Sequence, residues 1–268
     1  LSQGRTVYLV GESISGREVI KSFVSGDELH GQFDFPLYWA IRGAFAWETD
    51  GLDQLDTERA RSETAFGRNL MSNIIGNHDF TRFMAMSDGD ITPQNQGQAE
   101  DIGWNIPPKV DDVRSYKKLQ LALTFLFTQP GIPTLYYGDE YGISGAADPD
   151  NRRAMKFDDA LTVQEKENLE SVRKIISARN NVPAFRHGVH RTIRAEKDLY
   201  VYAKEFFQSK AVVALNRSTS TKPIEFISPG VKKWKNLLTN TEIPGDEKGT
   251  VRINLSGYES AIYIPANQ

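Results

Sequence analysis

Four short apolar runs, separated by stretches with a helical pattern, constrain most strongly what this chain can fold into. The runs are RTVYLVG (5–11), HGQFDFPL (30–37), LMSNIIGN (70–77) and GIPTLYYGDE (131–140). Three of them are almost continuously hydrophobic, which is typical of strands covered on both faces in a parallel sheet. Because parallel strands are joined by crossover connections, the pattern predicts right-handed β-α-β units of an α/β protein.

Helical patterns lie between and after these runs. They cover FPLYWAIRGAFAW (35–47), DVRSYKKLQLALTFLFTQPG (112–131) and TVQEKENLESVRKIISARNN (162–181). The second segment ends in Pro-Gly directly before the fourth apolar run, which predicts a helix stop at that point. In the third, Thr162 and Glu165 have the spacing of a capping box that begins a helix.

The pattern changes near residue 187. From there on, short alternating runs are separated by turn residues, as in an antiparallel sandwich. These runs are DLYVYAKEFF (198–207), KAVVALNRS (210–218), KPIEFIS (222–228), TVRINLS (250–256) and SAIYIPA (260–266). We therefore expect an α/β domain over residues 1–186 and an all-β domain over residues 187–268. The basic cluster VKKWK (231–235) is interpreted as a solvated face.

Composition limits the classes of partner. Charged residues make up 25% of the chain and the formal net charge is −3, and no stretch approaches the roughly 20 apolar residues of a membrane-spanning helix. We therefore expect neither a nucleic acid nor a membrane as partner. The chain has no cysteine, which excludes disulfides, thiolate metal sites and a cysteine nucleophile. The compartment stays open, with a secreted or periplasmic location favoured over a cytoplasmic one.

Polar residues follow two of the apolar runs. Glu12 comes directly after VYLVG, where Gly11 lets the backbone turn, and Asp79 comes after IIGNH. In a closed α/β barrel the loops after the strands converge on one face. Two carboxylates on that rim are the minimum for cleavage of a glycosidic bond. Either acid taken singly is more often an ordinary loop or capping residue than a catalytic one.

His78 has two interpretations. A lone histidine at a strand end is more often a structural residue than a ligand, and the chain has only four histidines, with no HxH or HExxH spacing. We therefore predict no metal site built on histidine. Beside Asp79, the imidazole indicates a hydrogen-bond donor to a neutral, polar substrate such as a sugar.

Three motifs together resemble the alpha-amylase family of glycoside hydrolases. VYLVGES (7–13) is similar to the family's fifth-strand motif, and NIIGNHDFTRF (73–83) to the segment after its seventh strand. GIPTLYYGDEYGISGAADPDNRRAM (131–155) is similar to its eighth strand and following loop. The resemblance covers nearly the whole chain. It implies the C-terminal half, strands five to eight, of a TIM (β/α)8 barrel followed by an all-β antiparallel sandwich domain.

The resemblance also implies roles for individual residues. Glu12 would be the general acid/base. Asp79 would fix sugar hydroxyls and stabilise the oxocarbenium-like transition state, and His78 would donate to the same ring. Asp148 and Arg152, within DPDNR, would hold the next glucose along the chain.

Arg82 is carried over with two alternatives left open. It either contacts substrate close to the nucleophile or pairs with an acid of the protein. The residues Tyr136, Tyr137, Asp139 and Glu140 are expected to serve barrel packing and loop support.

The family's nucleophile is an Asp in a motif with an Arg after the fourth strand, and these 268 residues contain no such motif at a strand end. The first residues also carry no start methionine and no signal-peptide pattern, so we expect that the chain begins within a longer protein. We expect an N-terminal fragment of the same protein to complete the barrel noncovalently. This chain shows no cofactor site, and calcium, where required, would be bound by that N-terminal half.

The sequence thus predicts a retaining α-glucan hydrolase acting on α-1,4-glucosidic bonds of starch-like oligosaccharides, with transglycosylation as a further activity. GAADPDNRRAM (145–155) leans toward amylase, neopullulanase and cyclodextrin-acting members. The alternatives are a sucrose-acting, trehalose-acting or branching member of the same fold, and a noncatalytic carbohydrate-binding relative. Glu12, His78, Asp79 and Arg152 together argue against the last, because an idle site has no need of all four.

Overall fold

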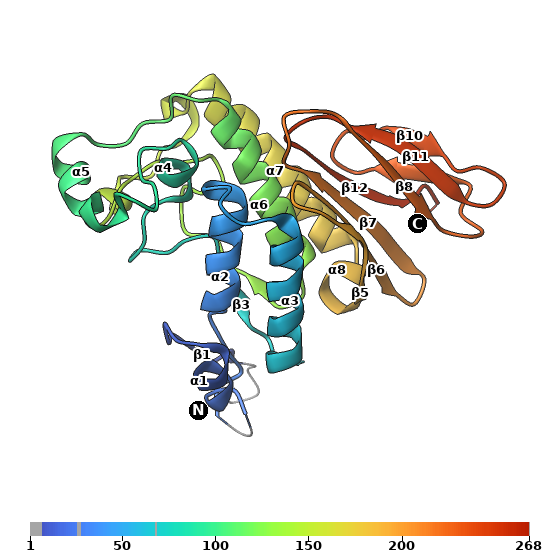
Figure 1. The fold of residues 1–268 in the computed structure, drawn as a ribbon, viewed down its shortest axis with the longest axis horizontal. Helices are drawn as coiled ribbons and strands as arrows, with labels where there is room; N and C mark the ends of the chain where they lie inside the picture. Colours follow the sequence, from blue (N-terminus) through green and yellow to red (C-terminus); the bar gives the residue numbers. More distant parts are fainter. Residues whose placement is uncertain (1–6, 26–27, 68, 268) are drawn as a thin grey trace.

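The computed structural model describes residues 7–25, 28–67 and 69–267 (Figure 1). Its parallel strands have two residues each: β1 (Val10–Gly11), β2 (Gly31–Gln32), β3 (Ser72–Asn73) and β4 (Ile132–Pro133). β1 pairs with β2 and β3 with β4, and a parallel bridge between Phe33 and Ser72 joins the two pairs. The strands therefore lie side by side in chain order.

This arrangement confirms the presence, direction and order of the predicted strands, whereas their expected length was wrong. Residues 5 and 6 of the first run lie outside the described residues. An apolar run favours a strand, but a ladder also needs a neighbour with which to exchange hydrogen bonds. Among the described strands, β1 and β4 each have a neighbour on one side only, and Pro133 in β4 has no N–H to donate.

The expected helices are present. The helical elements are α1 (Arg17–Ser22), α2 (Phe35–Ile41), a π-helical turn (Arg42–Ala46), α3 (Leu52–Phe66), α4 (Phe83–Ser87), α5 (Ala99–Asn105), α6 (Arg114–Thr128), α7 (Val163–Asn181) and α8 (Ala184–His187). Short 3₁₀ turns cover Gln96–Gln98, Asp150–Arg152 and Asp158–Ala160. α7 begins as predicted: Glu165 N donates to Thr162 Oγ1 at 3.2 Å and Thr162 N donates to Glu165 Oε2 at 2.8 Å.

The β domain is a two-layer antiparallel sandwich, as the alternating pattern predicted. Its strands are β5 (Val189–Ala195), β6 (Leu199–Phe206), β7 (Ser209–Asn216), β8 (Lys222–Ile227), β9 (Lys233–Asn236), β10 (Glu242–Pro244), β11 (Thr250–Leu255) and β12 (Glu259–Pro265). Six of them form a sheet in the order β10-β9-β12-β7-β6-β5, and β8 pairs with β11. Apolar side chains such as Val201, Phe226 and Val251 fill the space between the two layers.

The interpretation of the cluster VKKWK as a solvated face was wrong for Trp234. Lys232 and Lys233 are exposed as expected. Trp234, however, is only 1% exposed and packs edge-on against Phe226, with ring centroids 5.0 Å apart. Residues 233–235 of the cluster lie in the strand β9 (Lys233–Asn236), in which alternate side chains are buried.

The second face of the six-stranded sheet packs against the helices, which Figure 1 shows as neighbouring layers. Tyr200, Tyr202 and Val213 of the sheet belong to the same buried cluster as Phe125 of α6 and Val172 of α7. This shared core fixes the sandwich to the helical layer, because separating the two would expose large apolar side chains to water.

Polar contacts cross the same boundary. The Asp56 carboxylate on α3 accepts hydrogen bonds from Tyr200 Oη at 2.5 Å and Thr192 Oγ1 at 2.7 Å. Arg217, after β7, donates to the backbone oxygens of Ala44 and Asp50. The carboxylate of Asp56 and the guanidinium of Arg217 are thus paired across this junction.

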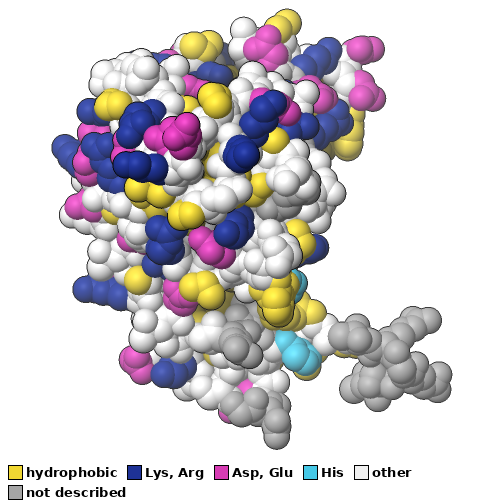
Figure 2. Space-filling view, turned by 90° about the vertical axis from the view of Figure 1, so that its right-hand side faces the viewer, with side chains coloured by type: hydrophobic (Ala, Val, Ile, Leu, Met, Phe, Trp, Pro, Cys, Tyr) yellow, Lys and Arg dark blue, Asp and Glu magenta, His cyan; other side chains and the backbone are white. Residues whose placement is uncertain are grey.

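The surface carries mixed charge. On the face that Figure 2 shows, Lys and Arg side chains are interspersed with Asp and Glu side chains. Within the described part of the chain, no helix is both long and apolar enough to cross a bilayer.

Candidate active site

Asn77 links the Glu12 carboxylate to the backbone of Asp79, the two acidic residues that the sequence singled out. Its Nδ2 donates to Glu12 Oε1 at 3.2 Å, and its Oδ1 accepts from Asp79 N at 2.9 Å. The chain reaches this point from the fully buried Ile74 and Ile75. The loops after β1 and β3 therefore meet at one amide side chain, with Glu12 and Asp79 on either side of it.

The loop after β4 supplies a second set of contacts to Asp79. Arg152 Nη2 lies 3.6 Å from Asp79 Oδ1 and 3.2 Å from Asp148 Oδ2, and Arg152 Nε donates to His78 O at 3.1 Å. The Nε2 atom of His78 is 3.4 Å from Asp79 Oδ1. The structure thus brings five of the six predicted site residues together: Glu12, His78, Asp79, Asp148 and Arg152.

These groups remain open to a ligand. The side chains of His78, Asp79 and Arg152 are 55%, 45% and 43% exposed. Ion pairs at such exposure stabilise a fold by only about 0–1 kcal/mol each. Fold stability therefore gives little reason for the cluster, whereas its unsatisfied donors and acceptors suit a polar ligand.

Arg82 does not join the exposed cluster, and it is only 2% exposed. Its Nε donates to Asn151 O and its Nη1 to Tyr137 O, both at 2.7 Å. Nη1 also lies 3.2 Å from Asp139 Oδ1, and the guanidinium covers the Tyr136 ring at 3.8 Å. Of its two alternatives, the structure therefore shows the pair with an acid and no path to a ligand.

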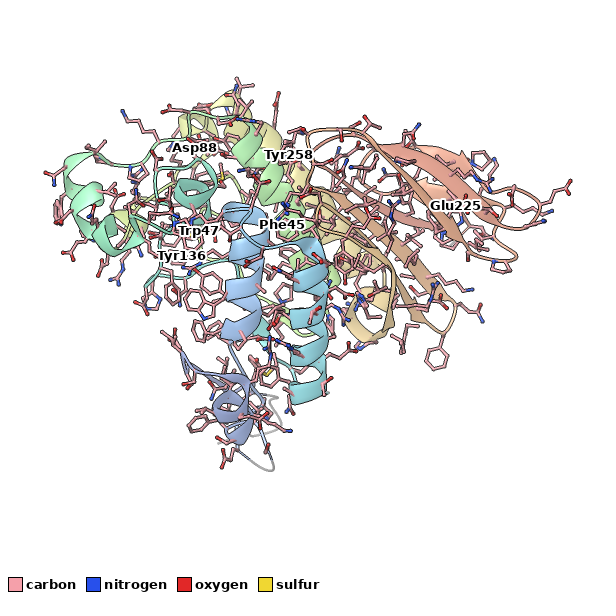
Figure 3. The ribbon with its side chains drawn as sticks, viewed as in Figure 1. Phe45, Trp47, Asp88, Tyr136, Glu225 and Tyr258 are labelled. Carbon is pink, nitrogen blue, oxygen red and sulfur yellow. The ribbon has the colours of Figure 1, made fainter. Side chains whose placement is uncertain are left out.

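Asp139 is buried beneath the cluster together with Arg82. Burial raises the pKa of Asp139 to about 7, because desolvation outweighs the attraction of the adjacent guanidinium. Tyr136 and Tyr137 pack against each other and under Arg82. Figure 3 shows Tyr136 on the side of α2 that faces away from the β domain. The expected supporting role of these residues fits this arrangement.

Two residues that shape the site were missed by the sequence reasoning. Asn77 lies within NIIGNHDFTRF (73–83) but was given no role of its own. Asn151 is 0% exposed and donates to His78 O at 2.8 Å and Phe80 O at 3.0 Å. An asparagine in a polar loop normally indicates a turn, so DPDNR offered no signal that this one is buried.

Among the residues that the structure describes, the candidate site offers no set of side chains for binding a metal ion. The described residues contain no group of three or more His, Cys, Asp or Glu side chains placed to hold a metal ion. The expectation about calcium concerned another segment and is not addressed by this chain.

Comparison with known proteins points to the same family as the three motifs. The family model for the alpha amylase catalytic domain matches residues 1–195. A cyclomaltodextrinase of Geobacillus thermopakistaniensis is 26% identical over 269 residues, covering 96% of this chain and 40% of that protein. A cyclomaltodextrin glucanotransferase of Niallia circulans is 30% identical over 190 residues, covering 70% of this chain and 22% of that protein.

Solved structures extend the likeness to the fold. The crystal structure of an Anoxybacillus alpha-amylase superposes with a TM-score of 0.77 at 25% identity, over 96% of this chain and 52% of that one. The chain thus spans about half or less of the length of these relatives. Its elements are those of a TIM barrel with a C-terminal β domain, and the chain belongs to the alpha-amylase family of glycoside hydrolases.

Proposed function

We propose that the complete protein hydrolyses α-1,4-glucosidic bonds of starch-like oligosaccharides with retention of anomeric configuration, and that it also transfers glycosyl groups to sugar acceptors. The observation that carries this proposal is the meeting of Glu12 and Asp79 at Asn77, with Arg152 beside the Asp79 carboxylate. The relatives named for cyclomaltodextrin conversion support an α-linked glucose polymer as substrate.

The proposed chemistry assigns one task to each group. Glu12 protonates the leaving glycosidic oxygen and then removes a proton from the attacking water or sugar. Asp79 and His78 hold ring hydroxyls and strengthen their bonds as the ring gains positive charge. Arg152 and Asp148 hold the neighbouring glucose. The nucleophile is an Asp from outside these residues, at the roughly 5–5.5 Å carboxyl separation that retention needs.

We further propose that this chain forms strands five to eight of the barrel and that an N-terminal segment of the same protein supplies the rest. Exposed apolar side chains around β1 support this arrangement: Val10 is 42% exposed, Leu9 48% and Ile14 56%. An open parallel edge flanked by apolar side chains favours association with another segment.

The isolated chain tests the proposed partner. Expressed alone, residues 1–268 should be inactive on maltoheptaose and prone to aggregate, and activity should appear on refolding with the N-terminal segment. Sedimentation and a reducing-sugar assay provide the readouts. A soluble, cooperatively unfolding and active monomer would rule the partner out.

Product analysis tests the activity. The complete protein should convert maltoheptaose and cyclodextrin to shorter maltooligosaccharides, and proton NMR should show the α anomer of each new reducing end before mutarotation. Sucrose should remain intact. Cleavage of sucrose, or binding of maltoheptaose without any product, would replace the proposal by one of the alternatives.

A further inference from the structure

A buried side chain fixes the backbone on both sides of Asp79. Asn151, in the 3₁₀ turn Asp150–Arg152, donates from Nδ2 to His78 O at 2.8 Å and to Phe80 O at 3.0 Å. These two carbonyls belong to the residues immediately before and after Asp79. One amide therefore determines the path of the short segment that carries the carboxylate.

Arg82, which follows Asp79 in the loop after β3, donates a hydrogen bond to the turn that contains Asn151. Its Nε donates to Asn151 O at 2.7 Å, and its backbone N donates to Gly145 O at 3.0 Å. The loop after β3 and the loop after β4 are thus joined in both directions. Because Asn151 is 0% and Arg82 2% exposed, neither can contact an oligosaccharide; they can act only through Asp79 and Arg152.

The ion pairs of the Asp79 carboxylate are too weak to fix its position. His78 and Arg152 lie 3.4 and 3.6 Å from its carboxylate and are half-exposed, so each pair contributes about 0–1 kcal/mol. By contrast, a buried carbonyl that loses its donor costs about 1–3 kcal/mol. Removal of Asn151 deprives Phe80 O of this donor and leaves His78 O with only the bond from Arg152 Nε, so the segment that carries Asp79 is then free to shift.

We propose that Asn151, together with Arg82, is a positioning residue that sets the Asp79 carboxylate relative to Glu12 for the transition state. This inference rests on the proposed function of the site. A shift of about 1 Å in a reacting group can lower a rate about 10²-fold. The loss should fall on kcat, because Asn151 lies beneath the groups that bind the sugar.

Asn151→Ala in the complete protein tests the inference, with Asn216→Ala as the matched control. Asn216, in β7 of the sandwich, is also 0% exposed and also donates from Nδ2 to backbone carbonyls, those of Ser220, Leu255 and Ser256. Both variants should lower the Tm. Assayed on maltoheptaose well below both Tm values, Asn151→Ala should lose about 10²-fold in kcat with a smaller change in KM, while Asn216→Ala keeps both constants.

A wild-type kcat in folded Asn151→Ala overturns the inference, as does an equal kcat loss in the control. If Asn151→Ala does not fold, Asn151→Ser, whose hydroxyl can still donate one bond, takes its place; an intermediate kcat supports the inference and a wild-type kcat overturns it. The experiment distinguishes failure of the inference from failure of the proposed function. If Glu12→Gln still turns over substrate, the proposed function is wrong. If Glu12→Gln is inactive but Asn151→Ala has unchanged turnover, only the positioning role is wrong.

Discussion

Glu12→Gln is expected to lower kcat on maltoheptaose by about 10³-fold or more while leaving oligosaccharide binding close to that of the unmodified protein. The amide keeps the shape of the side chain and can still accept the hydrogen bond from Asn77 Nδ2. It has no proton of suitable acidity for the leaving oxygen. Initial rates give kcat, and calorimetric titration with maltoheptaose gives the affinity.

Glu18→Gln is the control for this experiment. Glu18 is an exposed acid in the first turn of α1, in the same part of the chain, and its substitution removes one negative charge without touching the proposed site. It should leave kcat unchanged. Near-normal hydrolysis by Glu12→Gln would exclude Glu12 as the acid/base, and a kcat loss in Glu18→Gln would point to a general charge effect.

Arg82→Leu is expected to lower the free energy of unfolding by about 3–5 kcal/mol. The substitution leaves the carboxylate of Asp139, which is 3% exposed, without its cation, and it removes the donors to Tyr137 O and Asn151 O. Urea unfolding of the complete protein measures the change. The double variant Arg82→Leu/Asp139→Leu should recover part of the loss, because no buried charge then remains unpaired.

Arg61→Leu provides the comparison. Arg61 pairs with Glu58 at 2.6 Å, but its side chain is 64% exposed, so its loss should change stability by no more than about 0.5 kcal/mol. The same measurements, together with KM, distinguish the two alternatives for Arg82. A raised KM with unchanged stability would show that Arg82 contacts substrate after all, and would contradict the buried pair.

Much of the chain's architecture could be predicted because the signals are local. The capping pair Thr162 and Glu165 specifies the start of α7 within the chain segment itself, and the alternating runs of the sandwich record which side chains face inward. α3 escaped notice because its surface is mostly polar. Its pairs of Arg59 with Asp56 and Glu63, at 2.9 and 2.5 Å, stabilise a helix whose few apolar side chains make a weak pattern.

The residues of the site divide in the same way. Glu12 directly follows one apolar run and Asp79 comes shortly after another, which is why both were predicted. The order of the parallel strands then brings the loops after them together. The burial of a side chain cannot be predicted from its neighbours along the chain. Trp234 within a basic cluster and Asn151 within a polar loop are both buried, and only contacts between distant segments make them so.

The sequence by itself determined the kinds and the order of most elements and indicated candidate site residues, since hydrophobic periodicity, capping and strand-end acids act over a few neighbouring residues. The tertiary structure alone decided that Arg82 pairs with Asp139 away from any ligand and that Asn151 holds the two sides of Asp79. The physical reason is that burial and hydrogen-bond partners depend on which remote segments pack together, and the cost of leaving a buried polar group unpaired then selects its partner.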